Sequence, residues 1–156
     1  MNLDNLNRWL TLGANVGVLM GLLLLVFQLD QNRDMIRAQT RNEIATGVMQ
    51  LMALPAENPQ LAAVVRRGDA GEELTPDEHF QYRRFQIATF RYYENAHYQY
   101  RQGMYDEAEF SKQKEAWRAY AGRSPGSVAI WCEMRFNFST DFVDEMDATI
   151  IGEGQC

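Results

Sequence analysis

The feature that most constrains this chain is an uncharged run near its amino terminus. Residues 9–29 read WLTLGANVGVLMGLLLLVFQL and lie between Arg8 and Asp30 without a single charged side chain. At about 1.5 Å of rise per residue, such a run makes a helix roughly 31 Å long, the thickness of the hydrocarbon core of a bilayer. A core helix of a soluble protein is rarely apolar over this length. We therefore expect residues 1–29 to form a transmembrane span with a short N-terminal flank.

A cleaved signal peptide is the alternative interpretation of the same run. Such a peptide has a basic start and small residues before its cleavage site. Here the start contains Asp4 and one base, Arg8, and the run ends VFQLDQN without small residues at that spacing. The sequence therefore favours a retained, single-pass helix.

The orientation of the span is predicted from the arginines that flank it. One arginine precedes the run, Arg8, and three follow it closely: Arg33, Arg37 and Arg41. Because basic residues are enriched on the cytoplasmic side of membrane spans, residues 30–156 are expected to form a cytoplasmic helical domain.

The same three arginines lie four residues apart, on one stripe of a helix. They could bind anionic lipid headgroups from that stripe. A solvated face is the alternative, in which Asp30 and Asp34 pair with the arginines three residues further on. The sequence does not decide between the two.

Three glycines recur inside the uncharged run at a spacing of four residues. Gly13, Gly17 and Gly21 therefore share one helix face, and Asn15 adds an amide that needs a hydrogen-bond partner in lipid. Small residues at this spacing allow two helix backbones to approach closely within a membrane. These four residues are predicted to form a helix–helix interface, with another copy or with another membrane protein. The alternative is that glycine is only tolerated in the span.

Beyond the run, prolines, glycines and capping residues predict a series of helices. The first proline of the chain is Pro55, so one helix is expected from about residue 5 to about residue 54, ended by Pro55 and Pro59. Five further helices are expected to begin after Asn58, Thr75, Asp106, Ser124 and Ser139. Glycines are expected to end three of them: Gly68, Gly103 and Gly152. The predicted fold class is all-α, with a single N-terminal transmembrane helix that extends into a small helical bundle.

The helix predicted after Thr75 carries eight aromatic residues between Phe80 and Tyr100, around much of its circumference. Such a helix is expected to be central, with neighbours on several sides. Its basic and aromatic segment, residues 79–93, could also stack on RNA bases, but aromatics on several faces favour core packing. The net charge of −6 further argues against a nucleic-acid partner.

One pair of residues in the sequence resembles part of a metal site. Glu94 and His97 stand at i and i+3 on the same predicted helix, which is half of the ligand pattern of a di-iron bundle. The second half is missing, because the only other histidine, His79, directly follows Glu78. We therefore expect no metal and no cofactor, and we interpret the pair as polar groups of a bundle interior, with Glu94 bonded to Arg91 or Arg101.

The two cysteines, Cys132 and Cys156, are 24 residues apart and form no CxxC motif. They are expected to be unpaired thiols in a reducing compartment.

The order of the segments resembles a widespread group of small, uncharacterised bacterial membrane proteins. The similar stretches are WLTLGANVGVLMGLLLLVFQLDQNRDMIRAQT, with its exit residues Gln28, Gln31 and Asn32, then YYENAHYQYRQGMYDEAEF and SPGSVAIWCEMRFNFSTDFVDEM. The resemblance implies a bacterial inner-membrane protein with one N-terminal span and a helical cytoplasmic domain. It implies no catalytic residues.

These observations predict a membrane-anchored assembly or accessory protein that is not an enzyme. Its partners would be the lipid bilayer and other transmembrane helices, either as a homo-oligomer or as a subunit of a larger membrane complex. The alternative is a metal-binding or small-ligand-binding protein, or an enzyme, with a pocket near Glu94 and His97.

Overall fold

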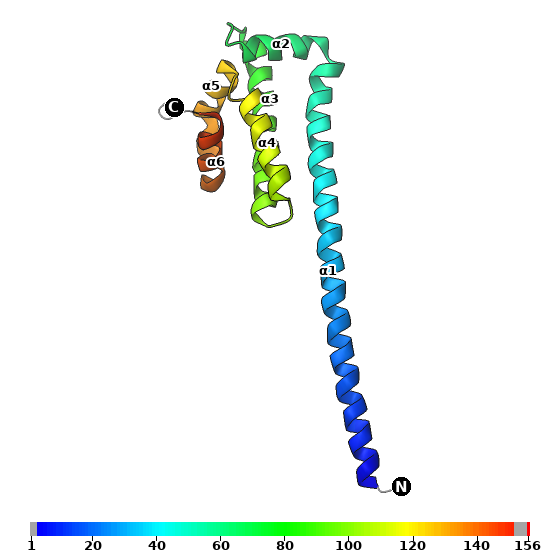
Figure 1. The fold of residues 1–156 in the computed structure, drawn as a ribbon. Coiled ribbons are helices and arrows are strands. Elements are labelled where there is room, and N and C mark those ends of the chain that lie inside the picture. Colours follow the sequence, from blue (N-terminus) through cyan, green and yellow to red (C-terminus); the bar gives the residue numbers. More distant parts are fainter. Residues whose placement is uncertain (1–2, 152–155) are drawn as a thin grey trace. The chain divides into compact units, whose positions relative to one another are not determined.

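The computed structural model describes residues 3–151 and Cys156, and within them every regular element is a helix (Figure 1). In chain order these are α1 (Leu3–Glu57), α2 (Pro59–Asp69), α3 (Pro76–Arg101), α4 (Glu107–Tyr120), α5 (Pro125–Met134), the 3-10 turn η1 (Arg135–Asn137) and α6 (Thr140–Ile150). The all-α fold class is therefore confirmed. The chain divides into two units, Met1–Gln39 and Thr40–Cys156.

The helix α1 is continuous, as predicted from the absence of proline. No break occurs between Leu29 and Ile44. Pro55 does not end the helix, contrary to expectation, but lies inside it, three residues from the next cap, Asn58. A proline in the last turn removes only one hydrogen bond near an end that frays in any case, so its cost there is small.

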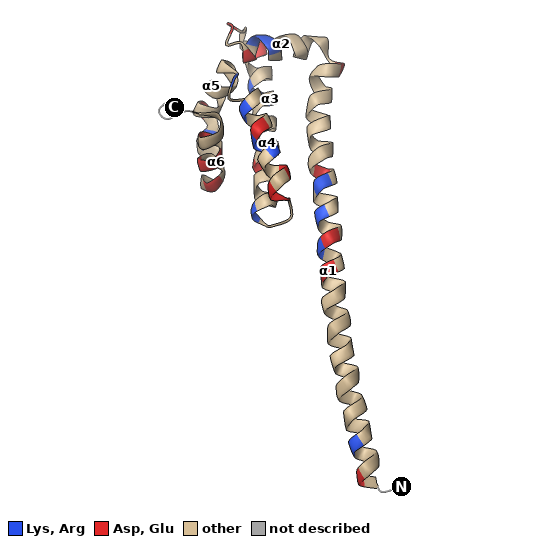
Figure 2. Ribbon diagram, in the orientation of Figure 1, with Lys and Arg blue, Asp and Glu red and all other residues tan. Residues whose placement is uncertain are grey.

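The first unit consists of the amino-terminal part of α1, where Figure 2 shows a long stretch free of charged residues. This helix is long and apolar enough to cross a membrane, with a mean hydropathy of 2.2 over its most apolar 18 residues. None of that window is buried inside the structure, whereas the core helix of a soluble protein is mostly buried. The apolar surface is thus left for lipid or for another protein to cover.

The predicted caps define the starts of the helices in the second unit. Asn58 accepts hydrogen bonds from the backbone of Gln60 and Leu61 at 3.1 Å each. Thr75 and Glu78 form the expected capping box, in which the Glu78 carboxylate accepts from the Thr75 backbone N–H at 2.9 Å. The predicted end of α6 at Gly152 lies outside the described residues.

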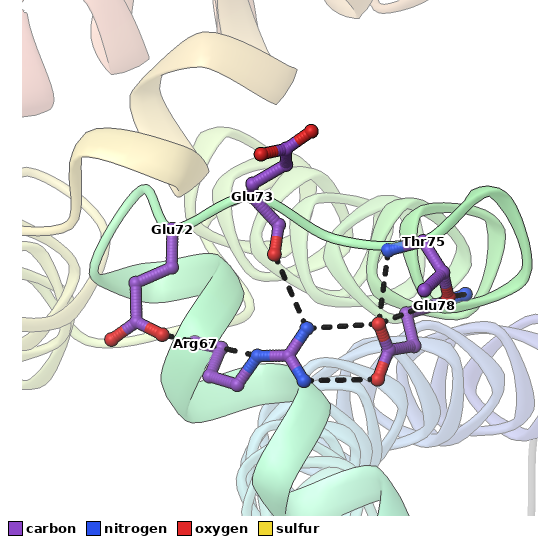
Figure 3. Close-up of polar contacts among 5 residues, drawn as sticks. All are labelled: Arg67, Glu72, Glu73, Thr75 and Glu78. Atoms are coloured by element: carbon purple, nitrogen blue, oxygen red, sulfur yellow. Dashed lines mark hydrogen bonds and ion pairs between the residues drawn. The ribbon is translucent and has the colours of Figure 1, made fainter.

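Arg67 ties the end of α2 to the start of α3 (Figure 3). Its guanidinium donates to both carboxylate oxygens of Glu78, at 3.1 and 2.8 Å, and to the backbone carbonyl of Glu73 at 3.2 Å. The bond from Arg67, followed by those from Thr75, lowers the pKa of Glu78 to about 2. The loop between the two helices is therefore closed by a fork of charge-assisted bonds.

The core of the second unit is built around α3, which contacts α2, α4, α5 and α6 as expected of a central helix. Its aromatic residues meet those of the later helices in one cluster. The largest fully buried side chains of this cluster are Phe90, Phe110, Trp117, Trp131 and Phe142. Phe90 lies 5.1 Å from Trp131, and Tyr93 stacks on Trp117 at 4.7 Å between ring centroids. Contacts between aromatic rings thus make up much of the core of this bundle.

Candidate functional site

The glycine face predicted as an interface lies on α1 with open space around it. A Cβ atom built on Gly13, Gly17 or Gly21 would meet no atom within 4 Å. Asn15 is exposed on the same helix. The glycines are therefore not required for packing within the chain, and a structural reason for them has to come from outside it.

The arginine stripe divides between the two units. Arg33 and Arg37 are exposed on the first unit. Arg41 belongs to the second unit, where its Nε lies 2.7 Å from a carboxylate oxygen of Glu109 on α4. The Arg41 side chain remains 70% exposed, so this ion pair leaves much of the arginine open to solvent.

Glu94 holds two parts of the bundle together through its two oxygens. One oxygen accepts from Arg91 at 2.6 Å, and the other accepts from the backbone N–H of Ser139 at 2.9 Å. Ser139 is the N-cap of α6 and makes no capping bond with its own side chain. Glu94 accepts from the backbone N–H of this residue, as the glutamate of a capping box does, but it comes from α3 and not from α6. Burial raises the pKa of Glu94, but the bonds from Ser139 and Arg91 outweigh it, and the pKa is lowered.

His97 is buried between aromatic rings. Its ring centroid lies 5.9 Å from that of Phe110 and 5.8 Å from that of Phe142. Burial lowers the pKa of His97, because the charged imidazolium would lose its hydration. The imidazole is therefore held in its neutral form inside the aromatic cluster.

Glu94 and His97 are not joined by a third metal-binding side chain. Among residues 3–151 and Cys156, no three histidines, cysteines or carboxylates come together as a metal site would require. The other predicted partner of Glu94, Arg101, forms its ion pair with Asp141 of α6 instead. Glu94 therefore caps α6, and His97 fills space in the aromatic core.

We predict that replacing Glu94 with glutamine lowers the stability of the domain by about 1 kcal/mol at neutral pH. The lowered pKa means that the carboxylate stabilises the fold above its ordinary pKa of about 4.3 and that this contribution is lost as pH falls through the folded value. Chemical unfolding at pH 7 and at pH 3 measures both states. An equal loss at the two pH values would contradict the capping role of the charge.

Replacing His97 with phenylalanine should change how the stability of the domain depends on pH. A histidine whose pKa is lowered by folding destabilises the protein as pH falls below about 6.5, since the unfolded state then binds the proton more readily. The His97→Phe protein should therefore lose less stability between pH 7 and pH 5 than the parent does. Loss of a bound metal in this variant, with its fold intact, would show that His97 is a ligand.

A cluster of polar contacts at Asp69, the last residue of α2, was not predicted from the sequence. One of its carboxylate oxygens accepts from Tyr82 at 2.8 Å, from Gln86 at 3.0 Å and from Ser124 at 3.1 Å. Gln86 in turn accepts from Ser127 of α5 at 3.1 Å. Asp69 lies in the stretch GDAGEE, which from its sequence is typical of a loop. Its contacts could not be predicted from this stretch, because all its partners are more than ten residues away.

The expectation of two unpaired thiols is wrong. Cys132 on α5 and Cys156 form a disulfide, with their Cα atoms 5.4 Å apart. Closing a loop of 24 residues stabilises a fold by roughly 3 kcal/mol, mainly by restricting the unfolded chain. The spacing in the sequence did not reveal the pair, because only the folded bundle brings the two residues within bonding distance.

Comparisons with known proteins assign no family to this arrangement. No protein-family model matches the chain, and no curated protein and no solved structure matches it. The resemblance to small bacterial membrane proteins therefore stays a prediction, and function is argued from the geometry.

Proposed function

We propose that this protein is a membrane-anchored helical assembly or accessory protein, without enzymatic activity, that acts through helix–helix contacts in the bacterial inner membrane and in the cytoplasm. The observation that carries the proposal is the amino-terminal part of α1, which is apolar, has no buried residue in its most apolar window and is long enough to span a bilayer. Its glycine face is supported as a contact surface by the open space at Gly13, Gly17 and Gly21.

The domain that follows supports a role in assembly rather than in catalysis. Glu94 and His97, the residues most suggestive of chemistry in the sequence, are engaged in capping and packing. Met49, Met52 and Leu54, near the end of α1, are each more than half exposed, so the second unit also has apolar side chains on its surface. Such surface is typical of a site that another protein covers.

The mass of the full chain, extracted from membranes in a mild detergent, tests the proposal. A single chain has a mass of 18.0 kDa. We expect a complex of several copies, or a complex with other membrane proteins. A protein that remains monomeric at every concentration and retains no partner would contradict the assembly role.

We propose further that the carboxyl-terminal domain faces the cytoplasm, which the three arginines after the span support against one before it. The Cys132–Cys156 disulfide favours the opposite side, because such bonds persist mainly in oxidising compartments. In the cytoplasmic orientation this bond would lie in a reducing compartment, where disulfides are rare.

Two reporters fused after Cys156 distinguish these orientations. We predict fluorescence from a protein that matures only in the cytoplasm, and no activity from a phosphatase that works only in the periplasm. An active phosphatase without fluorescence would place the domain in the periplasm.

A further inference from the structure

A cavity of about 350 Å³ lies in the second unit, away from Glu94 and His97. Its walls come from the carboxyl-terminal part of α1, from α2, α3 and α4, and from the start of α5. The lining is mainly aliphatic and aromatic, and the cavity is partly open to solvent. This size and character are those of sites that bind small organic molecules.

One wall of the cavity carries a tyrosine without a hydrogen-bond partner. Tyr93 is only 7% exposed, and its hydroxyl bonds to no other group among the described residues. Burial raises the pKa of Tyr93, and the nearby Tyr92, Tyr120 and Asp69 raise it further, so its hydroxyl stays protonated. The Tyr93 hydroxyl oxygen nevertheless remains accessible, and the space beside it is the cavity.

The carboxylate of Asp69 also lines this cavity. Its three hydrogen bonds from Tyr82, Gln86 and Ser124 all reach the same oxygen, Oδ1. The second oxygen, Oδ2, accepts no hydrogen bond from the part of the chain that the structure describes. The cavity thus contains a negative charge with an unused acceptor, positioned by three donors that hold it in place.

Gln113 adds a third acceptor on the opposite helix, α4. Its amide nitrogen donates to the hydroxyl of Tyr92 at 2.8 Å, which orients the side chain and leaves its carbonyl oxygen without a partner among the described residues. Tyr92, Trp117 and Tyr120 contribute aromatic surface to the same lining. Aromatic faces attract organic cations, and a nearby carboxylate strengthens that attraction.

From this arrangement we infer that the cavity binds an organic ammonium ion with an apolar body, its charged group between Asp69, Tyr93 and Gln113. The ammonium group donates to the free oxygen of Asp69 and to the lone pairs of the other two residues. The apolar body covers the aliphatic side of the cavity, which includes Leu51 and Met52. An anion of the same shape is excluded by repulsion from the carboxylate.

Three probes with one skeleton test this inference by calorimetry on the full chain in detergent: phenylbutylamine, phenylbutanol and phenylbutyrate. Heats of dilution into detergent alone are subtracted. The parent protein should bind the amine at least tenfold more tightly than the alcohol and should not bind the acid. Equal binding of all three would mean that only apolar partitioning is observed, and it would overturn the inference.

Substitutions at the polar end identify the site. Asp69→Asn keeps an oxygen for the three donors but removes the charge, and it should weaken amine binding at least tenfold while leaving alcohol binding unchanged. Tyr93→Phe removes a hydroxyl with no bond inside the protein, so stability should be preserved while amine binding weakens about fivefold. Tyr98→Phe, at an exposed position outside the cavity, is the matched control.

A variant that fills the cavity completes the test without touching the polar contacts of Asp69. Ala116 lies in the lining on α4, and Ala116→Phe should abolish binding of both the amine and the alcohol. If Asp69→Asn fails to fold, Tyr93→Phe and Ala116→Phe still decide the matter. Amine affinities unchanged in both of these folded variants would show that the ligand binds elsewhere.

Discussion

Alanine at Gly126 should lower the free energy of unfolding of the helical domain by about 3 kcal/mol, a large share of the roughly 5–15 kcal/mol that keeps a domain folded. The carboxyl end of α2 meets the amino end of α5 at this point. A Cβ atom on Gly126 would collide with the carbonyl oxygen of Gly68 and would lie 2.8 Å from the carbonyl carbon of Gly68 and 3.0 Å from the hydroxyl of Tyr82. The Gly68 carbonyl is a backbone group that already accepts from the N–H of Gly71, and the Tyr82 hydroxyl is held by its bond to Asp69.

The prediction is measured by thermal or chemical unfolding followed by circular dichroism. Gly13→Ala serves as the control, since the same methyl group there meets nothing within 4 Å. The control should unfold like the parent. A Gly126→Ala protein with parent-like stability would show that α2 and α5 are not packed as closely as the structure has them.

Much of this fold is predictable from sequence because its determinants are local. Asn58, Thr75 and Ser124 act on backbone groups two or three positions away, so each cap is visible in a short window. The central position of α3 follows from its aromatic residues, which need neighbours on several sides. The continuity of α1 follows from the absence of proline before Pro55.

The candidate sites are less predictable, because their partners are remote in sequence. Glu94 bonds to the N-cap of α6, which lies 45 positions later in the chain, and no residue near Glu94 indicates this contact. Asp69 likewise depends on partners from α3 and α5. The cavity and the disulfide also depend on how helices meet, and a one-dimensional pattern contains no distance between helices. The glycine spacing is visible in the sequence, but its effect depends on a partner that one chain does not contain.

Isoleucine at Gly17 should weaken association of the membrane span at least tenfold. A branched side chain at the middle of the glycine face holds two helix backbones apart, and the lost contacts are not recovered, because lipid is as apolar as the isoleucine. The substitution should not disturb the chain itself, since a Cβ at Gly17 has no neighbour within 4 Å. Membrane insertion should persist or improve with the added apolarity.

Leu19→Ile is the matched control for this substitution. Two residues along an α-helix correspond to a rotation of about 200°, so position 19 lies on nearly the opposite side of α1 from the glycines. It introduces the same side chain within the same span. A face-specific interface should therefore tolerate it.

Crosslinking of the full chain in native membranes, compared among the parent, Gly17→Ile and Leu19→Ile, tests the central claim most directly. The isolated segment 1–41 is measured alongside, so that contacts of the second unit do not mask a loss in the span. We predict crosslinked complexes for the parent and for Leu19→Ile, and their loss in Gly17→Ile. Equal crosslinking in all three proteins would show that the glycine face of α1 is not an interface.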